Sequence, residues 1–300
     1  MLIRLDLVPI QWNTHSCRVM ADFTIFYSWQ MDAPDKINKD LIGQALNAAV
    51  NALNAKPNTQ FDIVEADRIG VEQGMKEVPG SPEIATMMFE KIGESAIFVG
   101  DVSLVGMVVR DNAVRKKVPN PNVSIEEGFA AGVLGWERVI CVSNEYFGKN
   151  EEQAIDQRNR RFPINYCLTP DATDGETASV RIRLSKTLVT AIDTVRKFEL
   201  RKAERVLEQL NVPTIELLAA SRDARFLVRP EKAEAQSPVP ALQDLTVWDA
   251  CLVRMQELRI VRTELGLDEY DKSRYSYRWT AVGRKVIELI IEKFTPLAAN

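Results

Sequence analysis

Short apolar runs alternate with amphipathic stretches over residues 22–168 of the 300-residue chain. The amphipathic stretches repeat apolar side chains at helical spacing. They predict helices over 35–54, 82–92 and 122–134, and a shorter helix over 151–161. The apolar runs predict five strands, at 22–28, 61–67, 95–101, 137–143 and 162–168. Because strands alternate with helices and the inner strands are continuously apolar, we predict an α/β domain with a doubly wound, five-stranded parallel sheet.

The pattern changes after this region. A turn-rich segment at 169–176 precedes a long helical pattern, and a polar, proline-flanked stretch is typical of a linker. Near the C-terminus, a helix, a two-strand ribbon and a Thr280–x–x–Gly283 helix start resemble the end of a winged-helix domain. The predicted organisation is an N-terminal extension (1–20), the α/β domain (21–168), a helical segment (169–229), a linker (230–240) and a winged-helix-like unit (241–300).

The first twenty residues differ from the strands that follow. Arg4, Asp6 and Gln11 interrupt their apolar positions, so the apolar core of a secretory signal is missing. We interpret residues 1–19 as dispensable, and an ordinary first strand over Leu2–Pro9 is the alternative. No segment of the sequence approaches the ~20 apolar residues that span a bilayer, so we expect no membrane partner.

Composition excludes several classes of protein. With 46% apolar and 27% charged residues, the chain is neither disordered, collagen-like nor a coiled coil. A formal net charge of −4 provides no global basic field for nucleic acid or anionic lipid. The single histidine, His15, argues against a histidine-based zinc site or a Ser–His–Asp triad. Four cysteines lie far apart without a CxxC pair, which favours reduced thiols and a cytoplasmic location. They are Cys17, Cys141, Cys167 and Cys251.

Polar clusters follow the predicted strands, at the edge where parallel sheets bind ligands. After the first strand, Tyr27 and Trp29 offer aromatic rings, Ser28 a hydroxyl and Asp32 a carboxylate, which suits a nucleotide. The alternative is that Trp29 covers the core and Asp32 caps the next helix.

A second cluster joins Arg68 to Ser81, where a long loop closes on the amino end of a helix. Free backbone N–H groups there can bind an anion, and Arg68 can add a bidentate phosphate contact. A surface loop with a structural helix cap is an equally good interpretation of the spacing.

The third and fourth clusters contain carboxylates. Asp101 and Ser103 follow the most apolar strand, where a carboxylate is costly without a partner or ligand. Asn120 precedes the next helix, in which Asn122 and Glu126 are four apart and therefore share one face. Of the adjacent residues Glu126 and Glu127, we expect one to face inward and the other to face solvent.

The order of these clusters resembles a family of bacterial proteins related to TIR domains and nucleoside 2-deoxyribosyltransferases. The matching motifs are FYSWQxD, DR, PGSPxI, FVxDVS and PNPNVxIExG, and IDQRNRRFPINY (155–166) is similar to the family's PFDLRxRR stretch. The resemblance covers roughly residues 22–168 and implies a flavodoxin-like or TIR-like sheet. The sequence departs from the family at Ala154–Ile155, where Pro–Phe is usual, and at Glu127, where Leu is usual.

The resemblance also implies a chemistry. Glu126 matches the glutamate that attacks the sugar C1′ in the transferases and that holds the ribose of NAD in catalytic TIR domains. Cleavage at C1′ develops positive charge, which a carboxylate beneath the ring stabilises. Asp101, which we assign with Glu126 as a catalytic residue, could hold a sugar hydroxyl together with Asn122. Tyr27 or Trp29 could stack on the base. This chemistry needs no metal. NAD or a related nucleotide is its substrate and not a cofactor.

The implied function is cleavage of the N-glycosidic bond of NAD or a related nucleotide, and many relatives act in bacterial defence against phage. The alternative is a non-catalytic nucleotide sensor or a TIR-type assembly module. The oligomeric state stays open, a homo-oligomer included.

The C-terminal unit has nine basic and nine acidic residues. Its predicted wing nevertheless gathers Lys272, Arg274 and Arg278 around Tyr275 and Tyr277. We expect a protein contact or dimerisation there rather than nucleic-acid binding. A solvated run of charges is the remaining alternative.

Overall fold

The computed structural model describes residues 23–56, 61–65, 82–152, 163–224, 226–267 and 273–294. Within the chain two compact units are distinguished, one formed by Ala21–Val195 and one that includes Arg196–Asn300. Each unit is described by itself. The predicted extension 1–20, the binding residues Arg68 and Ser81, and most of the predicted helix at 151–161 lie outside the described residues.

The first unit contains a parallel sheet of five strands in the order β2-β1-β3-β6-β7. The strands are β1 (Phe23–Ser28), β2 (Phe61–Glu65), β3 (Ile97–Asp101), β6 (Val139–Asn144) and β7 (Ile164–Tyr166). Each overlaps one of the predicted apolar runs, so the predicted sheet is confirmed. The strand order reverses between β1 and β3, as it does in flavodoxin-like folds.

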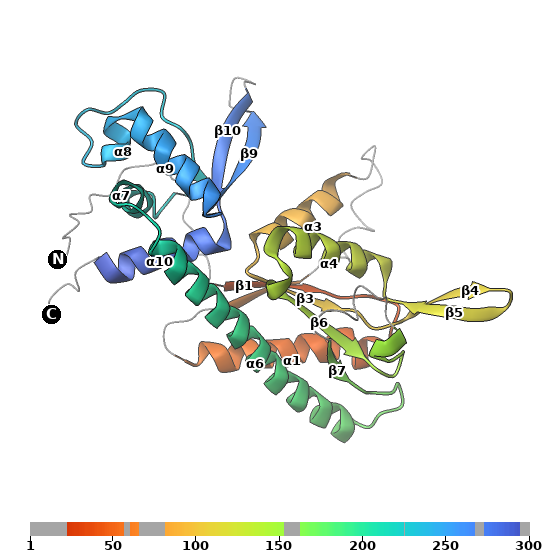
Figure 1. The fold of residues 1–300 in the computed structure, drawn as a ribbon. Helices are drawn as coiled ribbons and strands as arrows, with labels where there is room; N and C mark the ends of the chain where they lie inside the picture. Colours follow the sequence, from red (N-terminus) through yellow and green to blue (C-terminus); the bar gives the residue numbers. More distant parts are fainter. Residues whose placement is uncertain are drawn as a thin grey trace. The chain divides into compact units, whose positions relative to one another are not determined.

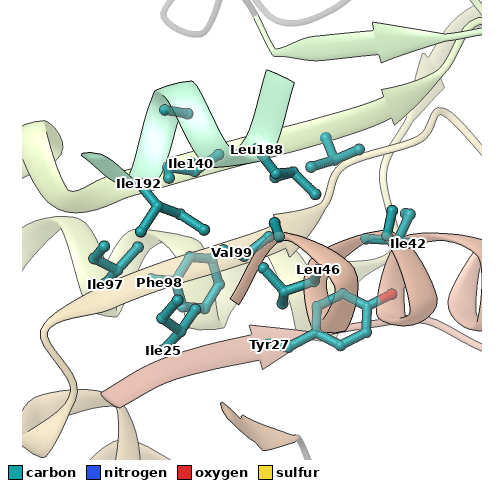
Figure 2. Packing of buried hydrophobic residues seen from close by; sticks show 14 of the residues in the cluster. Ile25, Tyr27, Ile42, Leu46, Ile97, Phe98, Val99, Ile140, Leu188 and Ile192 are labelled. Atoms are coloured by element: carbon teal, nitrogen blue, oxygen red, sulfur yellow. The ribbon is translucent and has the colours of Figure 1, made fainter. Parts of the chain in front are cut away.

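Helices cover both faces of this sheet, which confirms the doubly wound arrangement (Figure 1). The helices of this unit are η1 (Asp35–Ile37), α1 (Lys39–Asn54), α3 (Pro82–Glu94), α4 (Pro121–Leu134), η2 (Trp136–Arg138), η3 (Asn150–Glu152) and the first part of α6 (Asp174–Leu207). Figure 2 shows Leu46 of α1 and Leu188 of α6 beside Val99 of β3. Alternate residues of a strand face opposite sides of the sheet. On the side opposite Val99, Phe26 stacks on Phe98 with ring centroids 5.9 Å apart.

A two-stranded antiparallel hairpin, β4 (Gly106–Arg110) and β5 (Ala113–Val118), interrupts the alternation between β3 and α4. The sequence pattern predicts no strands here. Asp111 and Asn112 have φ values of 54° and 57°, which form the two-residue turn that matches strand twist. The hairpin extends away from the sheet, so it has no buried face and shows no buried-strand pattern (Figure 1).

The second unit combines helices with a three-stranded antiparallel sheet in the order β8-β10-β9. Its elements are the last part of α6, α7 (Val212–Ala220), β8 (Phe226–Leu227), α8 (Pro240–Gln243), α9 (Leu245–Glu257), β9 (Val261–Leu267), β10 (Ser273–Trp279) and α10 (Ala281–Phe294). They bury a separate apolar core around Trp248, Met255 and Ile290. The likeness of this unit to a winged-helix domain stays a prediction.

The start of helix α10 packs against the backbone of Arg259 and Ile260, which follow α9. The Thr280 hydroxyl donates to the Arg259 carbonyl oxygen at 2.6 Å and accepts from the Gly283 N–H at 3.0 Å. A β-carbon at Gly283 would collide with the Ile260 carbonyl oxygen. Only glycine therefore fits this approach without a shift of the backbone.

Candidate functional site

Three polar residues end the central strands on one edge of the sheet. Ser28 is the last residue of β1, Asp101 of β3 and Asn144 of β6, and all three side chains are fully buried or nearly so. Because the strand order reverses between β1 and β3, this edge is the topological switch point at which open α/β sheets bind ligands. The sequence-predicted clusters around Ser28 and Asp101 therefore meet at adjacent strand ends.

Glu126 comes to this edge from α4. Its Oε2 accepts a hydrogen bond from the Ser28 hydroxyl at 2.5 Å, which joins β1 to α4 across 98 positions of sequence. Glu126 is 8% exposed, and the Ser28 side chain is fully buried. A hydrogen bond to a carboxylate is stronger than one between neutral groups, so Ser28 fixes the orientation of this carboxylate.

Glu127 does not face solvent, and the expectation that one of the two adjacent glutamates would is wrong. It is 5% exposed, and its Oε1 lies 3.4 Å from the Cys141 Sγ on β6. Neighbouring helical positions differ by about 100° in direction, and α4 contacts both β3 and β6. The helix therefore buries both side chains at once, Glu126 against Ser28 of β1 and Glu127 against Cys141 of β6.

Asp101 is the centre of a buried hydrogen-bond network. Its Oδ1 accepts from the Ser103 hydroxyl at 2.6 Å and the Ser103 N–H at 3.1 Å. Its Oδ2 accepts from Asn38 Nδ2 at 2.9 Å and Gln30 Nε2 at 3.2 Å. Burial raises the pKa of the Asp101 carboxyl, while the bonds from Asn38, Ser103 and Gln30 act to lower it. Donors on three loops thus compensate in part for the carboxylate's loss of water, and burial remains the larger effect on its pKa.

The network continues to β6 and β7. Asn144 donates through Nδ2 to the Leu168 carbonyl oxygen at 2.9 Å and to Asn38 Oδ1 at 3.2 Å, and its N–H donates to Ser103 Oγ at 2.9 Å. The Tyr166 hydroxyl donates to the Ile37 carbonyl oxygen at 2.7 Å. Burial, reinforced by the charge of Asp101, raises the pKa of Tyr166 well above its ordinary value.

A hydrogen bond between the Asn120 amide and the Asp32 carboxylate connects the segment after β1 to the start of α4. Asn120 donates to Asp32 Oδ2 at 2.6 Å, while its Oδ1 caps α4 by accepting from the backbone N–H groups of Asn122 and Val123. Gln30 Oε1 accepts from the Asp32 N–H at 2.7 Å. Asn120 therefore acts as a helix cap that also orients Asp32. Asn122, predicted to line the site, has an exposed side chain.

The two aromatic candidates are buried. Tyr27 is 1% exposed, and its hydroxyl donates to the Lys39 carbonyl oxygen at 3.1 Å. Trp29 is 2% exposed, and the Lys39 ammonium lies 3.9 Å from its ring centroid. In this structure, both rings contribute to the core beneath the strand ends.

The polar clusters predicted from the sequence include Ser28, Asp101, Ser103, Asn120 and Glu126. They assign no role to Gln30, Asn38 or Asn144. Gln30 stands inside the quoted FYSWQxD motif, and Asn144 directly follows the strand predicted over 137–143, so both positions carried a signal. Asn38 lies inside the helix predicted over 35–54, whereas in the structure it directly precedes α1 and its side chain makes no cap hydrogen bond. Its fully buried side chain instead bonds to Asp101.

Comparison with protein-family models and with curated protein sequences finds no match to this chain. Within the part of the chain that the structure describes, no cluster of three or more His, Cys, Asp or Glu residues could hold a metal ion. No helix among the described residues is both long and apolar enough to cross a membrane.

Proposed function

We propose that the first unit cleaves the N-glycosidic bond of NAD or a related nucleotide, with Glu126 as the catalytic carboxylate. The observation that carries this proposal is the hydrogen bond from Ser28 to Glu126 at the β1/β3 switch point. A carboxylate held at a fixed orientation, in a site largely shielded from water, is suited to stabilise a developing cation.

In the proposed reaction, the C1′–N bond breaks and its electron pair leaves with the base. Glu126 stabilises the resulting positive charge at C1′, by contact or by covalent attack. Water then adds to C1′ and loses one proton. For NAD and water, the products are nicotinamide, ADP-ribose and one proton, so atoms and charge balance.

Asp101 takes a different role in this proposal. Its two carboxylate oxygens accept four hydrogen bonds from fully buried donors. We assign it as a positioning residue, because its bonds hold the segments that carry Gln30, Asn38 and Ser103. Ser28 is likewise a positioning residue, which acts through Glu126.

A non-catalytic nucleotide sensor is the second candidate. The observation in its favour is that Glu126 and Asp101 both accept hydrogen bonds from side chains of the protein itself. Such bonds stabilise a folded site whether or not a reaction follows. In that case nucleotide binding, and not base release, would be the measurable activity.

The test is release of free base from NAD and from a panel of nucleotides by the full chain, with candidate nucleotide activators added. Glu126→Gln keeps the shape but removes the charge, and loss of one such electrostatic contribution costs about 10²–10³ in rate. Glu127→Gln is the matched control, because it removes an adjacent carboxylate of similar burial that faces Cys141. We expect it to retain activity.

Equal base release by the wild type and Glu126→Gln would contradict the catalytic role. No release under any condition, together with nucleotide binding that survives in Glu126→Gln, would support the sensor. In cells, we propose that depletion of NAD or nucleotide limits phage growth. Plaque counts on bacteria that produce the wild type or Glu126→Gln would test that role.

A further inference from the structure

The two edges of the β4–β5 hairpin differ in chemistry. In β4, the successive residues Met107, Val108 and Val109 are 63%, 48% and 59% exposed. In β5, the run at 115–117 is entirely basic. Val108 pairs with Lys116 and Val109 with Val114, so Arg115 is the extra residue of a β-bulge on β5. Charged side chains and bulges are the features that prevent unwanted pairing at a strand edge. β5 has a bulge and three consecutive charges, whereas the only charge of β4 is Arg110 beside the turn.

The backbone of β4 also presents pairing groups outward. In a hairpin closed by a two-residue turn, the residues that flank the turn, here Arg110 and Ala113, form the hydrogen-bonded pair. By alternation, the N–H and C=O groups of Val109 and Met107 point to the open edge. Among the described residues, β4 and β5 form a sheet of two strands only.

Two carboxylates, Asp111 and Glu152, offset part of the charge of the four basic residues on the hairpin. Asp111 lies 3.7 Å from Arg110 and 3.6 Å from Arg115, and Lys117 forms an ion pair with Glu152 at 3.3 Å. Surface pairs of this kind contribute little to stability, but they weaken the basic field that a polyanion would need. The exposed aliphatic side chains instead favour a protein partner that buries them.

We propose that β4 pairs antiparallel with β4 of a second copy of the chain, which joins two hairpins into one four-stranded sheet. The segment 106–110 (GMVVR) is self-complementary about a two-fold axis at Val108. Val108 then faces Val108 of the second copy, Met107 faces Val109, and Gly106 faces Arg110. No like charges are directly opposed, and the basic β5 strands become the outer strands. Neighbouring strands are about 4.8 Å apart, so the outer strands are separated by more than a Debye length of about 8–10 Å.

This inference is independent of the proposed catalysis but concerns the same region. Ser103 precedes β4, and Asn120 follows β5. The pairing would therefore attach a second copy to the segment that lies between two residues of the candidate site.

The test is the mass of the full chain in solution by sedimentation equilibrium, for the wild type and matched variants. The wild type should be a dimer at micromolar concentration. Val108→Lys places two ammonium groups opposite each other at the two-fold axis, so it should raise the Kd of the dimer by at least about tenfold. Val114→Lys places the same charge on the other strand, at a residue 54% exposed, and should remain dimeric. Circular dichroism checks that both variants stay folded.

A second measurement tests the register. Residues directly opposed in an antiparallel pair lie within disulfide range, so Val108→Cys should form a disulfide-linked dimer under mild oxidation. Val114→Cys and the wild type should not. A monomeric wild type at tens of micromolar, or a dimer that Val108→Lys leaves intact, would overturn the proposal. Binding of nucleic acid by a monomeric chain would also overturn it.

Discussion

The Ser28 hydroxyl donates to Glu126 Oε2 at 2.5 Å and thereby links the end of β1 to helix α4. Two residues further along, Gln30 donates to Asp101. The end of β1 and the segment that follows it therefore contact both carboxylates that the sequence indicated as functional. Its position controls the orientation of one carboxylate and the solvation of the other.

Ser28→Ala should lower both stability and activity. A hydrogen bond to a charged group contributes about 1.5–3 kcal/mol, and the variant leaves the Glu126 carboxylate without this donor. Urea denaturation measures the first effect and base release the second. Ser95→Ala is the control, because Ser95 is also buried but donates to the Lys91 carbonyl oxygen at the end of α3. Equal loss of activity in both variants would argue against a specific role for Ser28.

Asp101→Asn should change how stability depends on pH. Burial raises the folded-state pKa of Asp101 above its ordinary value of 3.8, so the folded state binds this proton more tightly than the unfolded state. The resulting stabilisation is fully present below 3.8 and is lost as pH rises through the folded-state pKa.

The Asn variant removes this contribution and places an amide N–H₂ group among buried donors. At neutral pH it should be less stable by about 1–3 kcal/mol. Urea denaturation at a series of pH values should show that the difference between wild type and variant varies across the acidic range above pH 3.8. A constant difference would show that the titration of Asp101 is not coupled to folding.

Asn120→Ala should destabilise the first unit by about 0.5–2 kcal/mol, because α4 loses its cap and Asp32 loses a donor. Thermal denaturation measures the loss. Asn211→Ala removes the comparable cap of α7, where Asn211 accepts from the Thr214 N–H at 3.0 Å. Under the proposed function, only the Asn120 variant should also reduce base release.

Gly283→Ala should be destabilising, because the added carbon would collide with the Ile260 carbonyl oxygen. Gly132→Ala is the opposite case. Gly132 lies in α4 with an exposed side, and nothing would contact an added carbon within 4 Å. There alanine should stabilise the helix by about 0.5–1 kcal/mol. Shifts of the denaturation midpoint in opposite directions from the wild type would confirm both predictions. An unchanged midpoint for Gly283→Ala would show that α10 can move.

The central strands were predictable because their burial on both faces leaves a nearly continuous apolar run, as in 97–100 of β3. The β4–β5 hairpin was not, because the pattern of hydrophobic positions reports burial and this hairpin has no buried face. The orientation of Glu127 was missed for a different reason. Helical periodicity relates residues on one helix, whereas α4 lies over two strands and so can bury two adjacent carboxylates.

The site was predictable only at the strand ends. Ser28 and Asp101 are the last residues of apolar runs, so topology brings them together. The partners of Asp101 come from loops, where no periodicity reports burial. Asn38 is a case in point, since only the folded chain shows that its amide lies between Asp101 and Asn144.

Helix α6 sets the length of the smallest fragment that can be expected to fold by itself. Val180, Leu184, Leu188 and Ile192 of this helix belong to the core beneath the sheet. A fragment that stops at residue 168, the end of the predicted domain, would leave the apolar surface under those side chains open to water and prone to aggregation. Truncation after Val195 keeps the core covered. The fragment expected to fold by itself therefore extends beyond residues 22–168, which contain the sequence motifs.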